Sequence, residues 1–83
     1  MEKKKVGEIG HFFNKVSVAV VNLTADLKKG DTISIEGPST NFTQKADSMQ
    51  IDKKPVAVAK KGQSIGLKVS GPVKEKDVVY RVG

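Results

Sequence analysis

Residues 46–71 read ADSMQIDKKPVAVAKKGQSIGLKVSG, and this stretch decides the fold. After Gly62, apolar residues alternate with polar or small ones, which is typical of a β-strand with one buried face. The segment from Pro55 to Gly62 is short and rich in β-branched residues, so we predict a turn or a single helical turn there. The predicted inward positions of the strand after Gly62 are Ile65, Leu67 and Val69.

The same alternation recurs elsewhere along the chain. Residues 15–23 are apolar on both faces, which predicts a central or strongly bent strand. In residues 31–37 the isoleucines should face inward, while the threonine, serine and glutamate between them face water. In residues 77–83 alternate positions share one face, and Arg81 lies on the other. The positions that share the face in this last strand are Val78, Tyr80 and Val82.

Two further strands complete the predicted sheet, one before the tight turn at residues 13–15 and a short one starting at Ser48. Six strands with so little helix favour closure, because a closed barrel has no exposed sheet edges. We therefore predict an all-β fold, a small closed six-stranded antiparallel Greek-key barrel. It forms a single domain over residues 1–83, in which residues 1–5 are a charged N-terminal arm.

The amino-acid composition limits the location and the kinds of partner that we expect for this protein. The chain has no cysteine and no apolar leader, which predicts a cytoplasmic protein without disulfides. No stretch approaches the roughly 18 apolar residues of a membrane span, so no membrane partner is expected. The formal net charge of +6, from fourteen lysines and Arg81, predicts an acidic partner such as RNA or the ribosome. Solubility, or an origin in a heat-adapted organism, would explain the same charge.

Catalytic groups are scarce. His11 is the only histidine and lies beside two phenylalanines, which favours a packing or surface role. The carboxylates are scattered singly, and the glycines lack the Lys-Ser/Thr of a phosphate-binding loop. We therefore predict no enzyme activity, no catalytic residue, no cofactor, no metal and no small-molecule substrate.

Lysines in the turns are the candidate binding residues. If they converge on one rim, their field would attract phosphate groups, whereas charged residues in turns otherwise serve only to keep the turns solvated. The predicted phosphate contacts are Lys28, Lys29, Lys53, Lys54, Lys60 and Lys61, with Gln50 and Lys68 at the centre of the patch.

Three segments together resemble the second domain of translational GTPases, such as elongation factor Tu, elongation factor one-alpha and initiation factor two. The matching turns are a Leu-x-x-Gly-Asp turn, a serine-hydrophobic strand leading to Lys-Pro, and an Ala-x-x-Gly turn before a glycine-containing strand. They fall at residues 27–31, 48–55 and 59–67. Residues 10–23, GHFFNKVSVAVVNL, also look like the barrel domain at the end of certain collagenase-like peptidases.

The translation-factor resemblance implies a six-stranded barrel that meets RNA. The family's pocket for the aminoacyl end of tRNA uses an acidic and a basic residue, which match Gln50 and Lys53, while Lys68 replaces an apolar pocket residue. The resulting hypothesis is a non-enzymatic binding module for RNA or a ribonucleoprotein. The alternative is a protein-interaction subunit or accessory module that docks onto a separate enzyme or GTPase. Its expected apolar patch consists of Met49, Val56 and Val58.

Overall fold

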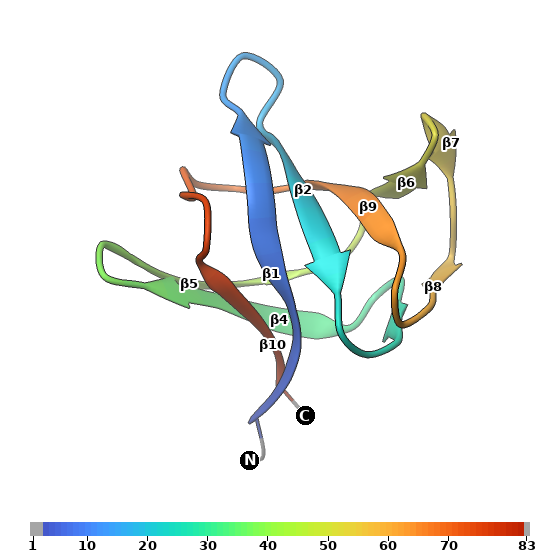
Figure 1. The fold of residues 1–83 in the computed structure, drawn as a ribbon, viewed down its shortest axis with the longest axis horizontal. Helices are drawn as coiled ribbons and strands as arrows, with labels where there is room; N and C mark the ends of the chain where they lie inside the picture. The colour runs from blue at the N-terminus through green and yellow to red at the C-terminus, as the bar shows by residue number, and fades with distance from the viewer. Residues whose placement is uncertain (1–2, 83) are drawn as a thin grey trace.

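The computed structural model describes residues 3–82, and within them every regular element is a strand, which confirms the all-β prediction. The chain runs through one long first strand and a series of shorter ones (Figure 1). The strands are β1 (Lys3–Phe13), β2 (Val18–Leu23), β3 (Leu27–Lys28), β4 (Thr32–Gly37), β5 (Thr40–Lys45), β6 (Met49–Ile51), β7 (Lys54–Pro55), β8 (Val58–Ala59), β9 (Ser64–Lys68) and β10 (Val78–Val82).

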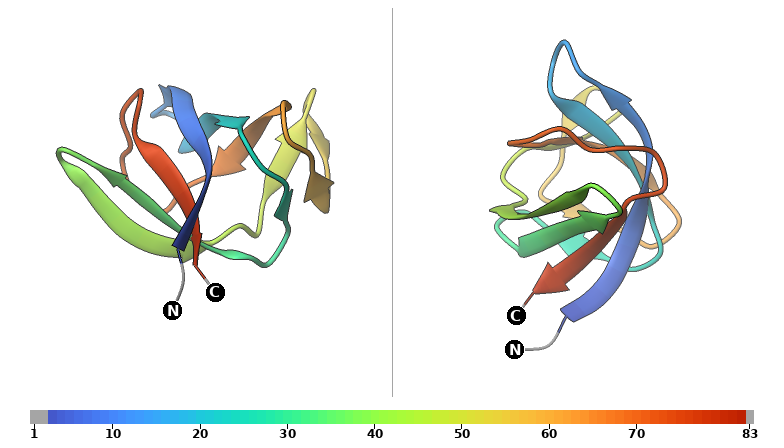
Figure 2. Two further views of the ribbon diagram at one scale, coloured as in Figure 1. Left: turned by 60° about the horizontal axis from the view of Figure 1, so that its bottom comes forward. Right: turned by 90° about the vertical axis from the view of Figure 1, so that its left-hand side faces the viewer.

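Eight of these strands form one antiparallel sheet in the order β5-β4-β10-β1-β2-β9-β6-β7, and β3 pairs with β8 in a separate ribbon. The sheet is strongly curved, with one concave face (Figure 2). Its end strands, β5 and β7, do not pair with each other, so the sheet is open. The prediction of a closed six-stranded barrel is therefore wrong in both closure and strand number.

The core fills the concave side of the sheet. The buried residues at alternate positions of β2 belong to this core. β2 lies between β1 and β9, as predicted for a central strand. The inward residues predicted for the strands at 31–37 and after Gly62 are confirmed, since each is at most 3% exposed. These residues are Ile33, Ile35, Ile65, Leu67 and Val69.

Two predictions of the direction in which side chains point are wrong. Ser34 is only 5% exposed, and its hydroxyl donates to Glu36 Oε2 on the same strand at 2.8 Å instead of facing water. In β10 the fully buried residue is Val79, and the face predicted from Tyr80 is only half-buried on the outer side. Ser34 and Tyr80 are directly opposite in the β4–β10 ladder, so each covers part of the other on the outer face of the sheet.

Three segments differ from the expected elements. β5 was not predicted as a strand, because its sequence TNFTQK has one large apolar residue and so gives little alternation. Between Lys54 and Ala59 the chain forms two short strands, β7 and β8, instead of a helical turn. Of the predicted N-terminal arm, residues 1–2 lie outside the described residues, and the lysines at 3–5 begin β1.

The turn that leads into β10 is fixed by a buried carboxylate. Asp77 is 2% exposed, and its Oδ2 accepts the backbone N–H of Lys74 at 2.9 Å. The Asp77 carbonyl also accepts the N–H of Ile9 in β1 at 2.8 Å. Gly37, at the end of β4, lies directly against this carboxylate, since a Cβ placed on Gly37 would stand 1.9 Å from Asp77 Oδ1. The β4–β5 hairpin therefore rests on the turn before β10.

Candidate functional site

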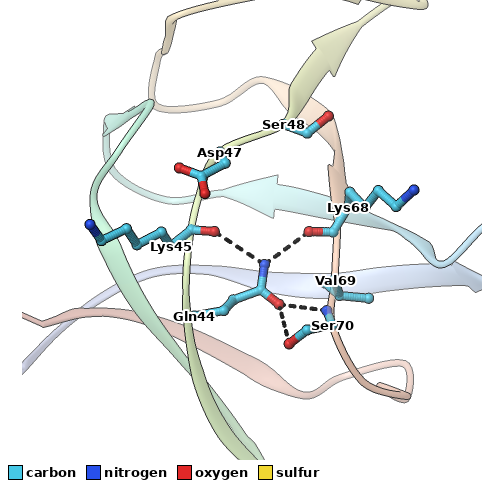
Figure 3. Close-up of a pocket in the computed structure, with 7 residues that line it drawn as sticks. All are labelled: Gln44, Lys45, Asp47, Ser48, Lys68, Val69 and Ser70. Atoms are coloured by element: carbon cyan, nitrogen blue, oxygen red, sulfur yellow. Dashed lines mark hydrogen bonds between the residues drawn. The ribbon is translucent and has the colours of Figure 1, made fainter.

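A cleft lies beside β5, at one end of the open sheet. We call this cleft the seam; its volume is about 360 Å³ and it lies between β5 and the chain that follows β9 (Figure 3). The seam is lined by Gln44, Lys45, Asp47, Ser48, Lys68, Val69 and Ser70. The seam therefore lies beside β5, one of the two end strands that leave the sheet open.

One side chain crosses the seam. Gln44 Nε2 donates to the carbonyl oxygen of Lys68 at 2.9 Å, and Gln44 Oε1 accepts the N–H of Ser70 at 2.7 Å (Figure 3). In a parallel ladder a strand residue contacts its neighbour in the same way, donating to one carbonyl and accepting from the N–H two residues further on. The Gln44 carboxamide therefore takes the place that a backbone amide of an inserted strand would occupy.

The edge of β5 that faces away from β4 has free backbone groups. The N–H of Ala46 donates to Asp31 O at 2.8 Å, which continues the β4–β5 ladder and fixes its alternation. Because hydrogen-bonded and non-hydrogen-bonded pairs alternate along an antiparallel ladder, the backbone groups of Asn41, Thr43 and Lys45 point outward. The carbonyl of Lys45 does so, since it accepts Gln44 Nε2 at 3.3 Å. The seam is thus bordered by an available strand edge.

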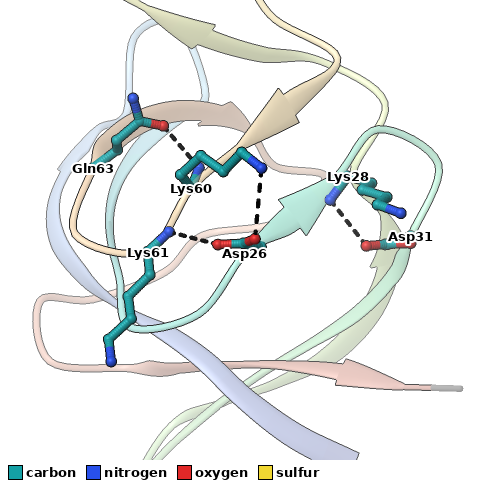
Figure 4. A network of polar contacts seen from close by, with 6 residues as sticks. All are labelled: Asp26, Lys28, Asp31, Lys60, Lys61 and Gln63. Carbon is teal, nitrogen blue, oxygen red and sulfur yellow. Dashed lines mark hydrogen bonds and ion pairs between the residues drawn. The ribbon is translucent and has the colours of Figure 1, made fainter.

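Four of the predicted binding lysines lie together at the β3–β8 ribbon. Lys28 pairs with Val58, the N–H of Lys29 donates to Ala57 O at 2.7 Å, and two lysines follow β8 (Figure 4). Carboxylates are interleaved with these cations. Asp26 Oδ1 accepts the N–H of Lys61 at 2.8 Å, and its Oδ2 lies 3.9 Å from Lys60 Nζ. The lysines here therefore alternate with acids that hold the turns, which weakens their common field.

The remaining predicted residues lie elsewhere. Lys53 and Lys54 are at the tip of the β6–β7 hairpin, where Lys53 has a positive φ of 65°. Gln50 is exposed in β6 between its partners in β7 and β9 and does not line the seam. Lys68 ends β9 and lines the seam, away from the tip of that hairpin. The structure thus distributes the predicted patch over three places.

An ion pair crosses the outer face of β10. Lys3 Nζ donates to Glu36 Oε2 at 2.7 Å and lies 4.8 Å from the centre of the Tyr80 ring. The hydrogen bond from Lys3, together with one from Ser34, holds the pKa of the Glu36 carboxyl below its ordinary value of 4.5. The same hydrogen bond to Glu36 raises the pKa of Lys3. The pair links β1 to β4 over the strand between them.

Of the predicted apolar patch, Val58 alone is exposed, at 42%. Met49 is 2% exposed and belongs to the core, and Val56 is half-buried against it, so the expected patch with Val58 does not form. The large exposed apolar residues at the tip of the β1–β2 hairpin are instead Phe13 and Val16, at 50% and 58% exposure.

Groups suited to acid–base or metal chemistry are sparse in residues 3–82. His11 Nδ1 lies 3.3 Å from Glu75 Oε2, and both side chains are exposed. The described part of the chain holds no group of three or more residues that could bind a metal ion. It also contains no helix that could span a membrane.

Comparisons with known proteins point to proteases. No protein-family model matches the chain. An uncharacterized protease of Methanocaldococcus jannaschii is 46% identical over 79 residues, which cover 94% of this chain and 19% of that protein. A collagenase of Porphyromonas gingivalis is 33% identical over 82 residues, which cover 96% of this chain and 23% of the collagenase. The chain spans about a fifth of the length of these curated relatives.

A solved structure has the same architecture. The C-terminal domain of a Geobacillus thermoleovorans protein assigned to the U32 peptidases superposes with a TM-score of 0.89 and 20% identity, covering 94% of this chain and 99% of that one. The chain has the fold of a U32 peptidase C-terminal domain. The predicted resemblance to a collagenase-like peptidase domain is therefore supported, whereas the resemblance to translation factors is not shown.

The functional hypotheses from the sequence are corrected by these relatives. The interpretation as a translation-type RNA-binding module is wrong, because the similar proteins are proteases and a collagenase. The alternative of a subunit docking onto a separate enzyme or GTPase is wrong as well, since the similar segment lies within the proteases themselves. Nothing in the relatives assigns catalysis to this domain alone.

Of the seven residues that line the seam, sequence reasoning named Lys68 as a binding residue and missed the other six. Gln44 and Ser70 are 26 positions apart, and only the folded sheet brings them together. The single signal in the sequence was the polar run at residues 40–45, which is typical of an edge strand but carries no information on its neighbour.

Proposed function

We propose that the chain acts as a non-catalytic domain of a protease-family protein, in which another part of the protein carries the catalytic groups. The observation that supports this most directly is the coverage. Nearly the whole chain, 94–96% of it, aligns with only 19–23% of each protease. Such a segment has the size of an accessory domain beside a larger catalytic one.

The geometry supports the same conclusion. The one histidine is exposed in β1 beside Glu75, and the seam is lined by amide, hydroxyl and lysine groups, with Asp47 its one carboxylate. General acid–base catalysis needs a positioned acid and base within reach of one substrate group. The seam offers no such pair among its lining residues, which supports a non-catalytic role.

The experiment is a domain replacement in the Porphyromonas gingivalis collagenase. In one variant the segment that aligns with this chain is deleted, and in a second it is replaced by this chain. We expect the isolated chain to cleave no collagen, the deletion to lose most cleavage at low collagen concentration, and the replacement to regain it. A replacement that folds but cleaves no better than the deletion would refute the proposal, as would cleavage by the isolated chain.

A further inference from the structure

We infer that the seam binds an extended acidic polypeptide segment, which adds as a strand to the free edge of β5 and displaces the Gln44 carboxamide. This inference deepens the proposed function, because it names what a protease domain would hold. It rests on backbone geometry and charge within the seam, and its test needs only the isolated chain.

The first argument is that both sides of the seam carry backbone donors and acceptors that an added strand could bind. On one side, the outward backbone groups of Asn41, Thr43 and Lys45 offer donors and acceptors at strand spacing. On the other side, the carbonyl of Lys68 and the N–H of Ser70 are held by Gln44. A strand between two neighbours lies about 4.7–4.9 Å from each. A glutamine side chain carries its amide away from its own backbone by a similar length, so the amide marks the path of a single strand.

The second argument is that a peptide can displace the Gln44 side chain from the seam. Its hydrogen bonds to Lys68 and Ser70 lie at the exposed surface, so they compete with water and hold the side chain only weakly. A peptide backbone supplies the same donor and acceptor and adds further hydrogen bonds to the β5 edge. Strand addition of this kind gives affinity through the main chain and specificity through alternate side chains.

The third argument is charge complementarity. Lys45 and Lys68 border the seam from its two sides (Figure 3), and neither forms an ion pair within residues 3–82. Asp47 is the one acid that lines the seam, which leaves it a net positive charge. Along an added strand, every second side chain points to the same face. A segment with acidic residues at alternate positions would therefore meet these lysines.

The test is a titration with a synthetic peptide pool. Each peptide is about eight residues long, enough to span β5, with glutamate at alternate positions and random apolar residues between them. A matched pool has lysine in place of glutamate. Binding is followed by fluorescence anisotropy of the labelled pool, and its location by the NMR signals of the Gln44 side-chain amide and the Ser70 N–H.

Two variants separate strand addition from general attraction to a basic protein. Thr43→Pro removes one outward N–H and leaves the β4 ladder intact, since proline is tolerated on an edge strand when its nitrogen faces away from the sheet. The pair Lys45→Gln/Lys68→Gln is matched in charge by Lys53→Gln/Lys54→Gln at the distant hairpin. Circular dichroism establishes that each variant is folded.

We expect the glutamate pool to bind and to shift the Gln44 and Ser70 signals, while the lysine pool does not bind. Thr43→Pro should weaken binding about two- to tenfold, as expected for loss of one main-chain hydrogen bond in a strand pair. The Lys45/Lys68 pair should weaken binding more than its matched control does. Absence of binding, binding unaffected by Thr43→Pro, or equal losses in the two lysine pairs would each overturn the inference. None of these outcomes depends on the collagenase replacement, so either proposal can fail alone.

Discussion

Replacing Gly37 by alanine should destabilise the domain strongly. Gly37 ends β4 and starts the turn into β5, the strand that borders the seam. Its backbone is not in the left-handed region, so the reason for glycine here is space. An added Cβ would stand 1.9 Å from Asp77 Oδ1 and 2.7 Å from its Cγ, and both contacts are far shorter than atoms tolerate. The buried carboxylate must therefore move.

The cost has two parts. Overpacking a tight site costs about 1–3 kcal/mol. Moving Asp77 also breaks its part-buried hydrogen bond to the N–H of Lys74, and losing such a bond costs about 0.5–1.5 kcal/mol. Partial relaxation of the exposed turn lowers the sum, so we expect a loss of about 2–4 kcal/mol, a large fraction of the roughly 5 kcal/mol available to a small domain. The urea midpoint should fall by roughly 1–3 M.

The assay is urea denaturation followed by circular dichroism, with Gly66→Ala as the matched control. A Cβ on Gly66 meets Val18 Cγ1 at 3.4 Å, an ordinary contact, so that variant should change stability by less than about 1 kcal/mol. In the double variant Gly37→Ala/Asp77→Ala the clash is removed, and its loss should be smaller than the sum of the single losses by about 1 kcal/mol or more. Equal stabilities for Gly37→Ala and Gly66→Ala, or strict additivity in the double variant, would refute this reasoning.

Three further predictions concern the polar contacts. Gln44→Glu keeps the acceptor for the N–H of Ser70 but loses the donor to the carbonyl of Lys68. We expect its free energy of unfolding, measured by chemical denaturation, to fall by about 0.5–1.5 kcal/mol. An unchanged free energy of unfolding would show that the bridge across the seam is not formed. Because the folded-state pKa of Glu36 is depressed by Lys3, its contribution to stability is present above pH 4.5 and is lost as the pH falls through the lower folded-state pKa. The denaturation midpoint should therefore drop less on acidification in Glu36→Gln than in the unmodified chain, and equal drops would contradict the pair. Asp26→Ala removes the acceptor of the Lys61 N–H, which should cost about 0.5–1.5 kcal/mol and speed hydrogen exchange of that amide, whereas an unchanged exchange rate would exclude the bond.

The sequence predicted the core strands because their pattern is strong. Isoleucine, leucine and valine at alternate positions in β4 and β9 leave one choice of inward face, and the structure agrees. The glycine-containing turn at Gly62, with its φ of 89°, was likewise fixed by local chemistry, whereas the first hairpin turn lies at residues 14–17, later than the predicted 13–15.

The seam could not be predicted, because the strand that borders it lacks such an apolar pattern. Edge strands such as β5 are polar, so their sequences resemble loops, and whether a sheet closes depends on how two distant edges meet. Closure was expected because it removes edges, but here the side chain of Gln44 bridges the gap instead of a backbone ladder. The lysines were visible in the sequence, yet their grouping, with Asp26 placed between them, arises only from the β3–β8 pairing.

The central claim is that the domain helps a protease bind its substrate without taking part in the chemistry. The most direct test is a comparison of kcat and KM for collagen cleavage by the Porphyromonas gingivalis collagenase with the aligned segment deleted and with this chain in its place. A domain that contributes only binding changes KM, so the deletion should raise KM about tenfold or more over the replacement, with kcat within about twofold. A collapse of kcat at unchanged KM would place chemistry in this domain, and identical constants would leave it no part in cleavage; either result would contradict the account.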